Sequence, residues 1–90
     1  MGRTYTVVIL HEKDGRYSAI APALNCASWG DTVPEAIRNV EEAISGYIEV
    51  MTEHGMPVPD DTDTFTVEMG DAVDAVIYRV VIQEELASVA

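Results

Sequence analysis

Two histidines and one cysteine carry the most versatile chemistry in the chain, and their spacing argues against a shared site. His11, Cys26 and His54 fall in three different predicted elements, and none lies at ligand spacing from another. The serines lack a nucleophile-elbow context, and the glycines form no phosphate-binding loop. We therefore expect no catalytic residue, no metal and no cofactor. His11 would take part in catalysis only if a partner supplied the remaining groups.

Carboxylates are plentiful, so a two-metal hydrolase must be considered. Such a site needs acids that project from neighbouring strands into one cleft, and the apolar segment 4–10 contains none. Asp60, Asp61 and Asp63 are close in sequence but lack the glycine and terminal glutamate of a calcium loop. We expect a protein that is not an enzyme, and a hydrolase is the function that the sequence favours least.

The distribution of charge favours a basic protein as partner. Of sixteen Asp and Glu residues, four lie in residues 1–40, balanced by four Lys and Arg, and the other twelve lie in 41–90, where Arg79 is the only base. This excess repels nucleic-acid phosphates, so we expect no direct nucleic-acid binding. A basic protein surface would complement it. The alternative is that the acids only keep a small domain in solution.

The residues expected to contact a partner combine one aromatic side chain with acids. Trp29 is the only tryptophan, and it is either packed in the core or exposed as a partner-facing anchor. The predicted partner-binding residues are Trp29, Asp60, Asp61, Asp63 and Glu68.

A hairpin and a short strand are expected to carry the first of these residues. Segments 5–11 and 16–21 are strand-like, and Asp14-Gly15 between them is a turn signal because glycine accepts positive φ. Pro22 ends the second segment because it has no amide hydrogen for a ladder, and Cys26 to Gly30 is predicted as a third strand.

One long helix is expected after the third strand. Thr32 can cap it while Glu35 reaches back, and Pro34 costs no hydrogen bond in the first turn. Apolar residues then recur at helical spacing, and Gly55 with the following prolines ends the element, so the helix is predicted over Val33 to His54. Its buried face should contain Val40, Ile44, Ile48 and Met51.

Two further strands are predicted after the helix. Thr64 to Met69 alternates as a strand does, and Gly70-Asp71 breaks it. Ala75 to Ile82 fits a helix or a buried strand, and its β-branched content favours the strand. A helical turn is possible over 84–89. A single sheet with one helix leaves an open edge, so we expect a homo-oligomer whose interface contains Ile77, Tyr78, Val80 and Ile82.

The length allows one domain, residues 1–90, with residues 61–90 as its C-terminal strands. No apolar run is long enough to span a membrane, and no signal peptide is visible at the N-terminus. A single cysteine cannot form an internal disulfide and agrees with a reducing compartment. We expect a cytoplasmic protein that does not associate with membranes.

Four blocks of residues resemble the HicB-like antitoxin family over residues 4–60. They are Asp14-Gly15-Arg16-Tyr17, the loop from Pro22 to Cys26, Gly30-Asp31-Thr32 with Glu35-Ala36, and Gly55-Met56-Pro57-Val58-Pro59. In this family Asn25 stands where Pro-Gly is common. The resemblance implies an α+β fold, a partial, degenerate RNase H-like fold of order β-β-β-α-β, here with an extra C-terminal strand.

The resemblance also implies a function. Such antitoxins bind and neutralise a small basic HicA-like ribonuclease toxin, and longer relatives add a C-terminal DNA-binding module. Only about twenty residues follow the expected fourth strand here, and this segment is acidic overall, so we do not expect operator binding. The alternative function is a stand-alone HicB-like oligomer with a different protein or small-molecule partner.

Overall fold

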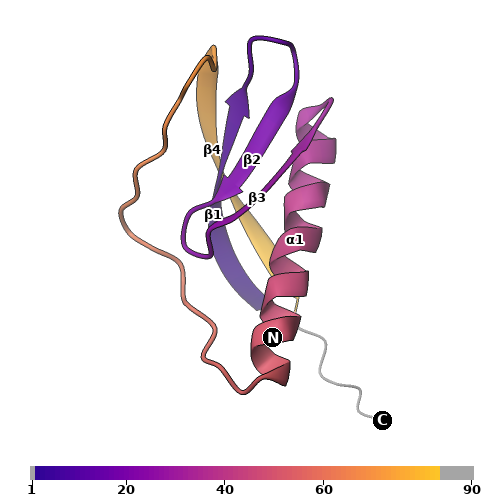
Figure 1. The fold of residues 1–90 in the computed structure, drawn as a ribbon, viewed down its shortest axis with the longest axis vertical. Helices are drawn as coiled ribbons and strands as arrows, with labels where there is room; N and C mark the ends of the chain where they lie inside the picture. The colour runs from indigo at the N-terminus through magenta and orange to yellow at the C-terminus, as the bar shows by residue number, and fades with distance from the viewer. Residues whose placement is uncertain (1, 84–90) are drawn as a thin grey trace.

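The computed structural model describes residues 2–83 as one antiparallel sheet with one helix against it. In chain order the elements are β1 (Gly2–His11), β2 (Tyr17–Ala21), β3 (Cys26–Gly30), α1 (Val33–Glu53) and β4 (Asp74–Gln83). The strands are arranged β3-β2-β1-β4, and α1 covers one face of the sheet (Figure 1). The α+β class and the hairpin, third strand, helix and last strand agree with the sequence prediction.

The two loops that connect β1 to β2 and β2 to β3 each contain a residue with positive φ. Gly15 has a φ of 94°, and its N–H donates to the carbonyl of Glu12 over 3.0 Å. Asn25, between β2 and β3, has a φ of 54°, a conformation that asparagine adopts more readily than most residues. These turns fix the pairing of Val8 with Ile20 and of Ser18 with Trp29.

The helix begins and packs as its sequence predicts. The Glu35 N–H donates to the Thr32 hydroxyl over 3.2 Å, and the Glu35 carboxylate accepts from the Asp31 N–H over 2.7 Å. Ala36, Val40, Ile44 and Ile48 are buried, whereas Met51 is only partly buried. The helix ends at Glu53, and His54 is its C-cap.

Gly30 permits the close approach of β3 to α1. A Cβ built on this residue would lie 2.6 Å from the backbone nitrogen of Ala36, a distance that no side chain tolerates. Glycine is therefore required here for steric reasons, and it sets the spacing between sheet and helix.

The core lies between the sheet and α1, but β1 is buried on both faces. Tyr5, Val7 and Ile9 belong to the core under α1, together with Val80 and Ile82 of β4. The alternate residues Thr6, Val8 and Leu10 face the other way and are also buried. Residues 56–73, here called the strap, run along this second side from the end of α1 to the start of β4 (Figure 1).

The strand predicted over Thr64 to Met69 is wrong. This part of the strap joins no ladder, and Val67 is partly buried while Thr64, Thr66 and Glu68 are exposed. Phe65 and Met69 are exposed as well, so the alternation in the sequence is not matched by alternating burial, and β4 occupies the edge of β1. Residues 61–83 therefore contribute one strand. The helical turn predicted over 84–89 lies outside the described residues.

Candidate partner-binding surface

Trp29 is on the surface, on the side of the sheet opposite α1. Its neighbours in β3, Ser28 and Gly30, are turned toward the helix side, and alternation along the strand directs Trp29 outward, where half of it is exposed. The guanidinium of Arg16 lies over the indole, 4.2 Å from the ring centroid. This cation–π contact holds the ring in one orientation. Of the two interpretations of Trp29 from the sequence, core packing is excluded.

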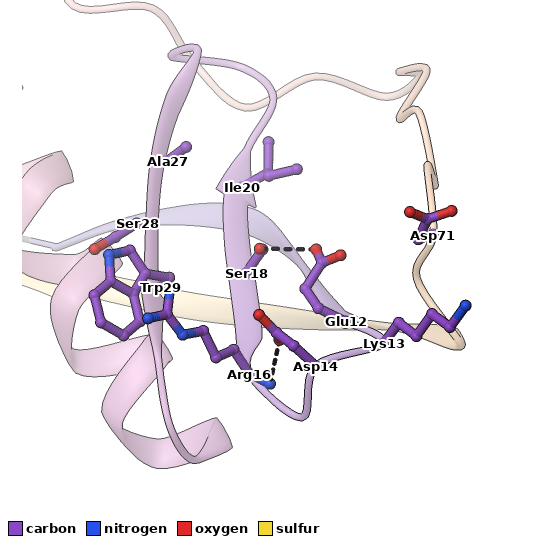
Figure 2. Close-up of a pocket in the computed structure, with 10 residues that line it drawn as sticks. All are labelled: Glu12, Lys13, Asp14, Arg16, Ser18, Ile20, Ala27, Ser28, Trp29 and Asp71. Atoms are coloured by element: carbon purple, nitrogen blue, oxygen red, sulfur yellow. Dashed lines mark hydrogen bonds between the residues drawn. The ribbon is translucent and has the colours of Figure 1, made fainter.

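A cleft of about 660 Å³ lies beside Trp29, between the hairpin turn and the strap. Figure 2 shows Asp71 of the strap across from Glu12, with Ile20 and Ala27 at the other end. The remaining lining residues are Lys13, Asp14, Arg16, Ser18 and Ser28. The hydroxyl of Ser18 donates to the Glu12 carboxylate over 2.8 Å. The cleft therefore combines apolar surface with charged groups of both signs, three acids and two bases.

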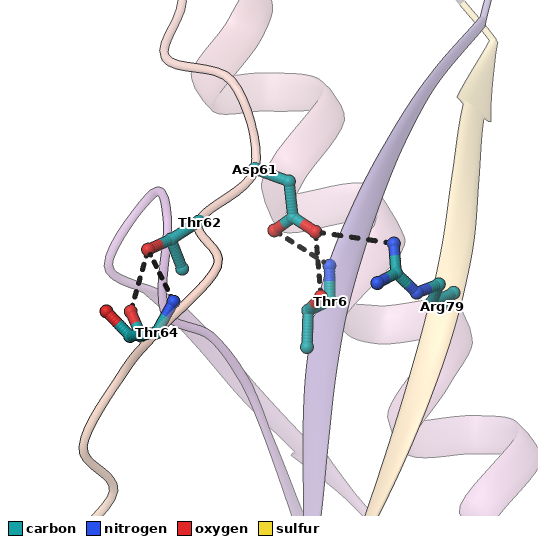
Figure 3. A network of polar contacts seen from close by, with 5 residues as sticks. All are labelled: Thr6, Asp61, Thr62, Thr64 and Arg79. Atoms are coloured by element: carbon teal, nitrogen blue, oxygen red, sulfur yellow. Dashed lines mark hydrogen bonds and ion pairs between the residues drawn. The ribbon is translucent and has the colours of Figure 1, made fainter.

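Asp61 anchors the strap to the sheet (Figure 3). Its two carboxylate oxygens accept from the Thr6 N–H over 3.0 Å and from the Thr6 hydroxyl over 2.7 Å. The Arg79 guanidinium lies 3.8 Å away. Burial alone would raise the pKa of Asp61, but hydrogen bonds from Thr6 and from the Thr62 backbone, with the charge of Arg79, lower it below its ordinary value.

Asp61 has a structural role that its sequence context did not indicate. Its side chain is 18% exposed and its lone pairs are used within the chain. It replaces a neighbouring strand, because β2 pairs with β1 only from Val8 onward and leaves the Thr6 amide without a ladder partner. Asp61 therefore holds the strap in place, and most of its carboxylate is covered within the chain.

The other predicted acids are exposed on the strap. Asp60 is almost fully exposed and lies 3.7 Å from Arg3, while Asp63 and Glu68 are also on the surface. Asp71, which the prediction omitted, lines the cleft beside Trp29. Asp71 is the strap residue that shares this cleft with Trp29, whereas Asp60 lies beside Arg3 near the other end of β1.

The four residues of the predicted β4 interface differ in the exposure of their side chains. Ile77 is 62% exposed, Tyr78 is partly buried, and Val80 and Ile82 are each 5% exposed because they face α1 within the core. The exposed apolar residues of β4 are instead Val76, Ile77 and Val81. Which residues face outward depends on the register of β4 with β1, and the apolar run in the sequence contains no sign of it.

The histidines and the cysteine lie apart, as expected. His11 stacks on Tyr17 with ring centroids 4.6 Å apart, and its Nδ1 is 4.0 Å from an Asp74 oxygen. Cys26 is a free thiol that donates to the Leu24 carbonyl, and burial raises its pKa. His54 caps the helix. Within residues 2–83, no three His, Cys, Asp or Glu side chains are grouped to hold a metal ion.

The sequence analysis did not name two residues that hold the side chains of this surface in place. Arg16 covers Trp29, and Thr6 binds Asp61. Thr6 gave a usable signal, since it is the single polar residue in the buried stretch of β1 and a buried hydroxyl needs a partner. Arg16 gave none, because its contact with Trp29 joins two strands.

The fold and this surface define a small two-layer α+β protein with a polar, aromatic-anchored face. The chain belongs to the HicB_like antitoxin family of bacterial toxin-antitoxin systems, whose family model matches residues 5–87. In the described part of the chain, α1 does not combine the length and apolar character needed to cross a membrane.

Two relatives are similar over 58 residues, which is 63% of this chain. UPF0150 protein ssr1765 of Synechocystis sp. is 48% identical, and the match covers 73% of its length. UPF0150 protein Ta0767 of Thermoplasma acidophilum is 43% identical, with 84% of its length covered.

A solved structure has the same fold. The N-terminal domain of the antitoxin HicB of Burkholderia pseudomallei superposes with a TM-score of 0.61 at 23% identity. The match covers 92% of this chain and 99% of that one. The sheet and helix of this chain are thus the fold of a HicB N-terminal domain.

Proposed function

We propose that this protein is a non-enzymatic antitoxin that binds and neutralises a small basic HicA-like ribonuclease toxin. One observation carries the proposal: in a member of an antitoxin family, the exposed Trp29 and Asp71 of the acidic strap line one cleft. The opposite side of the sheet is occupied by α1, whose packing builds the core. The face with Trp29 is therefore the binding face.

The electrostatics of this face suit a cationic protein. Asp60, Asp63, Glu68 and Asp71 are exposed on a strap that contains no Lys or Arg. Such a surface attracts a basic partner during encounter and fixes its orientation. Trp29 then supplies the apolar contact area that a rim of charges lacks.

The same charge distribution supports the absence of direct nucleic-acid binding. Arg79, the one base in residues 41–90, is engaged by Asp61 and leaves no cluster to neutralise phosphates. The free thiol of Cys26 is in keeping with a reducing compartment, and we place the protein in the cytoplasm as one domain. We interpret the fold as a degenerate RNase H-like sheet, since β1 contains no carboxylate.

The test is a binding titration with a purified HicA-like toxin, read by calorimetry and by inhibition of its ribonuclease activity. Trp29→Ala should weaken binding about 30-fold or more, as expected for a buried aromatic anchor. Val50→Ala, an equally exposed apolar residue on α1, is the matched control and should bind as the parent does. No binding by the parent, or an unaffected Trp29→Ala variant, would refute the proposal.

Self-association is a second part of the proposal, and it also supports the alternative of a stand-alone oligomer with another protein or small-molecule partner. It is favoured by the outer edge of β4, which has no neighbour among the described strands. We propose that the chain forms a homo-oligomer.

A further inference from the structure

The two edges of the sheet differ in how well they are protected from pairing with a further strand. The β3 edge is short, and α1 packs mainly against β3 and β2. The side-chain amide of Asn39 on α1 donates to the Trp29 carbonyl over 2.9 Å. A short edge covered by a helix, with a backbone acceptor already bound, is a protected edge. It is a poor site for strand addition.

The β4 edge has none of these protections. It is ten residues long and pairs with β1 without interruption from Asp74 opposite His11 to Gln83 opposite Gly2, so no bulge bends it away. It contains no proline and no lysine. Val76, Ile77 and Val81 expose about half or more of their surface. Long, flat, apolar edges of this kind pair with another strand.

The register of β4 with β1 shows which backbone N–H and C=O groups of β4 point to the outer edge and could pair with another strand. In an antiparallel ladder each residue directs its N–H and C=O to the same side, and the side alternates along the strand. The Thr6 amide points to Asp61, away from β4, so Arg79 opposite Thr6 directs its own N–H and C=O to the outer edge. By alternation Ala75, Ile77 and Val81 do the same.

The charge of this edge selects its occupant. The only charged residues of β4 are Asp74 and Arg79, and Arg79 is already paired with Asp61. A basic toxin would find no acidic row here, because the exposed acids lie on the strap and on α1. A partner strand with the same apolar, nearly neutral composition fits best, and β4 itself has that composition.

We propose that β4 pairs antiparallel with β4 of a second copy, and that the two sheets become one continuous sheet with both helices on the same face. This inference specifies the self-association in the proposed function and is independent of toxin binding. It also accounts for Val76, which is half exposed on the α1 side because the helix leaves that part of β4 uncovered.

The pairing has a preferred register centred on Tyr78. Residues that lie opposite each other in an antiparallel pair point to the same face of the sheet, so their numbers are both even or both odd. A two-fold axis perpendicular to the sheet must therefore pass between one residue and the same residue of the second copy. An axis at Arg79 would place two guanidiniums opposite each other, which is unfavourable. An axis at Ile77 would leave Val81 beyond the end of the partner strand. With Tyr78 on the axis, Ile77 faces Arg79, Val76 faces Val80 and Ala75 faces Val81.

The first experiment measures the mass of the full chain in solution by light scattering during size exclusion. The parent should be a dimer at micromolar concentration. Ile77→Lys with Val81→Lys should be a monomer, since like charges and lysine stems would crowd the shared edge, whereas Val50→Lys on α1 should stay dimeric. All the altered side chains are exposed, and circular dichroism checks that each variant remains folded.

The outcomes separate the two levels of the proposal. A monomeric parent would refute self-association altogether. A dimer that survives the double substitution in a folded protein would refute only the β4 interface. Retained toxin binding by the monomeric double variant would show that the antitoxin function does not need the dimer.

The second experiment tests the register with cysteine cross-links in a Cys26→Ser background. Tyr78→Cys should form an intermolecular disulfide on mild oxidation, because residues facing each other in a non-hydrogen-bonded pair have Cα atoms about 4.5 Å apart. Ile77→Cys should cross-link much less. The reverse order would overturn the register, and the absence of a cross-link in both variants would overturn the pairing.

Discussion

The two faces of the sheet are closed by different means. On one face α1 buries a continuous apolar stripe against Tyr5, Val7 and Ile9. On the other face the strap runs without forming a helix or strand, and hydrogen bonds tie it to β1 at Tyr5, Thr6 and His11. The contrast indicates that stability comes chiefly from the α1 face, and that the strap face can be altered with smaller effects on folding.

The largest expected effect is on the α1 face. Ile44→Asp would bury an unpaired carboxylate in the core and should cost about 4 kcal/mol or more of unfolding free energy, enough to unfold a domain of this size. Val50→Asp, on the exposed side of the same helix, should change stability by less than about 0.5 kcal/mol. Denaturant unfolding measures both, and a melt of Ile44→Asp within a degree or two of the parent would disprove the orientation of α1.

A smaller effect is expected at the contact between β3 and α1. Gly30→Ala places a Cβ against the Ala36 backbone and should cost about 1–3 kcal/mol through forced separation of sheet and helix. Gly46→Ala meets nothing within 4 Å and should stabilise the helix by about 0.5–1 kcal/mol. Thermal unfolding of the pair should therefore give shifts of opposite sign. Shifts of the same sign would refute the close packing.

On the strap face, Asp61→Asn should cost about 1–2 kcal/mol at pH 7, because it removes a charged acceptor from Thr6. The pKa of Asp61 is lowered in the folded state, so its contribution is complete above the ordinary aspartate value of about 3.9 and is lost as the pH falls through the folded value. The stability difference between variant and parent should therefore shrink below about pH 4. The exposed Asp60→Asn is the control, and a difference that stayed constant into acid would contradict the anchor role.

The elements with local signals could be predicted from the sequence. The hairpin follows from Asp14-Gly15 and the helix from Thr32 with Glu35, since a turn or cap is decided within a few residues. The strap could not be predicted, because its alternating pattern resembles a strand and only the sheet edges determine whether it finds a ladder.

The candidate surface was predicted in part for a related reason. Trp29, Asp60, Asp63 and Glu68 were named from residue type and charge and are exposed, but Asp71, which lines the cleft beside Trp29, was not named. Asp61 could not be separated from Asp60 and Asp63, since only the unpaired amide of Thr6 selects it. The burial of the Val80 and Ile82 side chains could not be predicted either, because strand composition does not reveal which face of the sheet a residue takes.

The most direct test of the account compares loss of the same charge on the two sides of the molecule. One variant carries Asp63→Asn, Glu68→Gln and Asp71→Asn on the strap, and the other carries Glu42→Gln, Glu49→Gln and Glu53→Gln on exposed positions of α1. Each is titrated with the basic toxin at low and at physiological salt. The strap variant should lose about tenfold in affinity and most of the salt dependence, while the α1 variant binds nearly as the parent does. Equal losses in both, or a larger loss in the α1 variant, would contradict the assignment of the binding face.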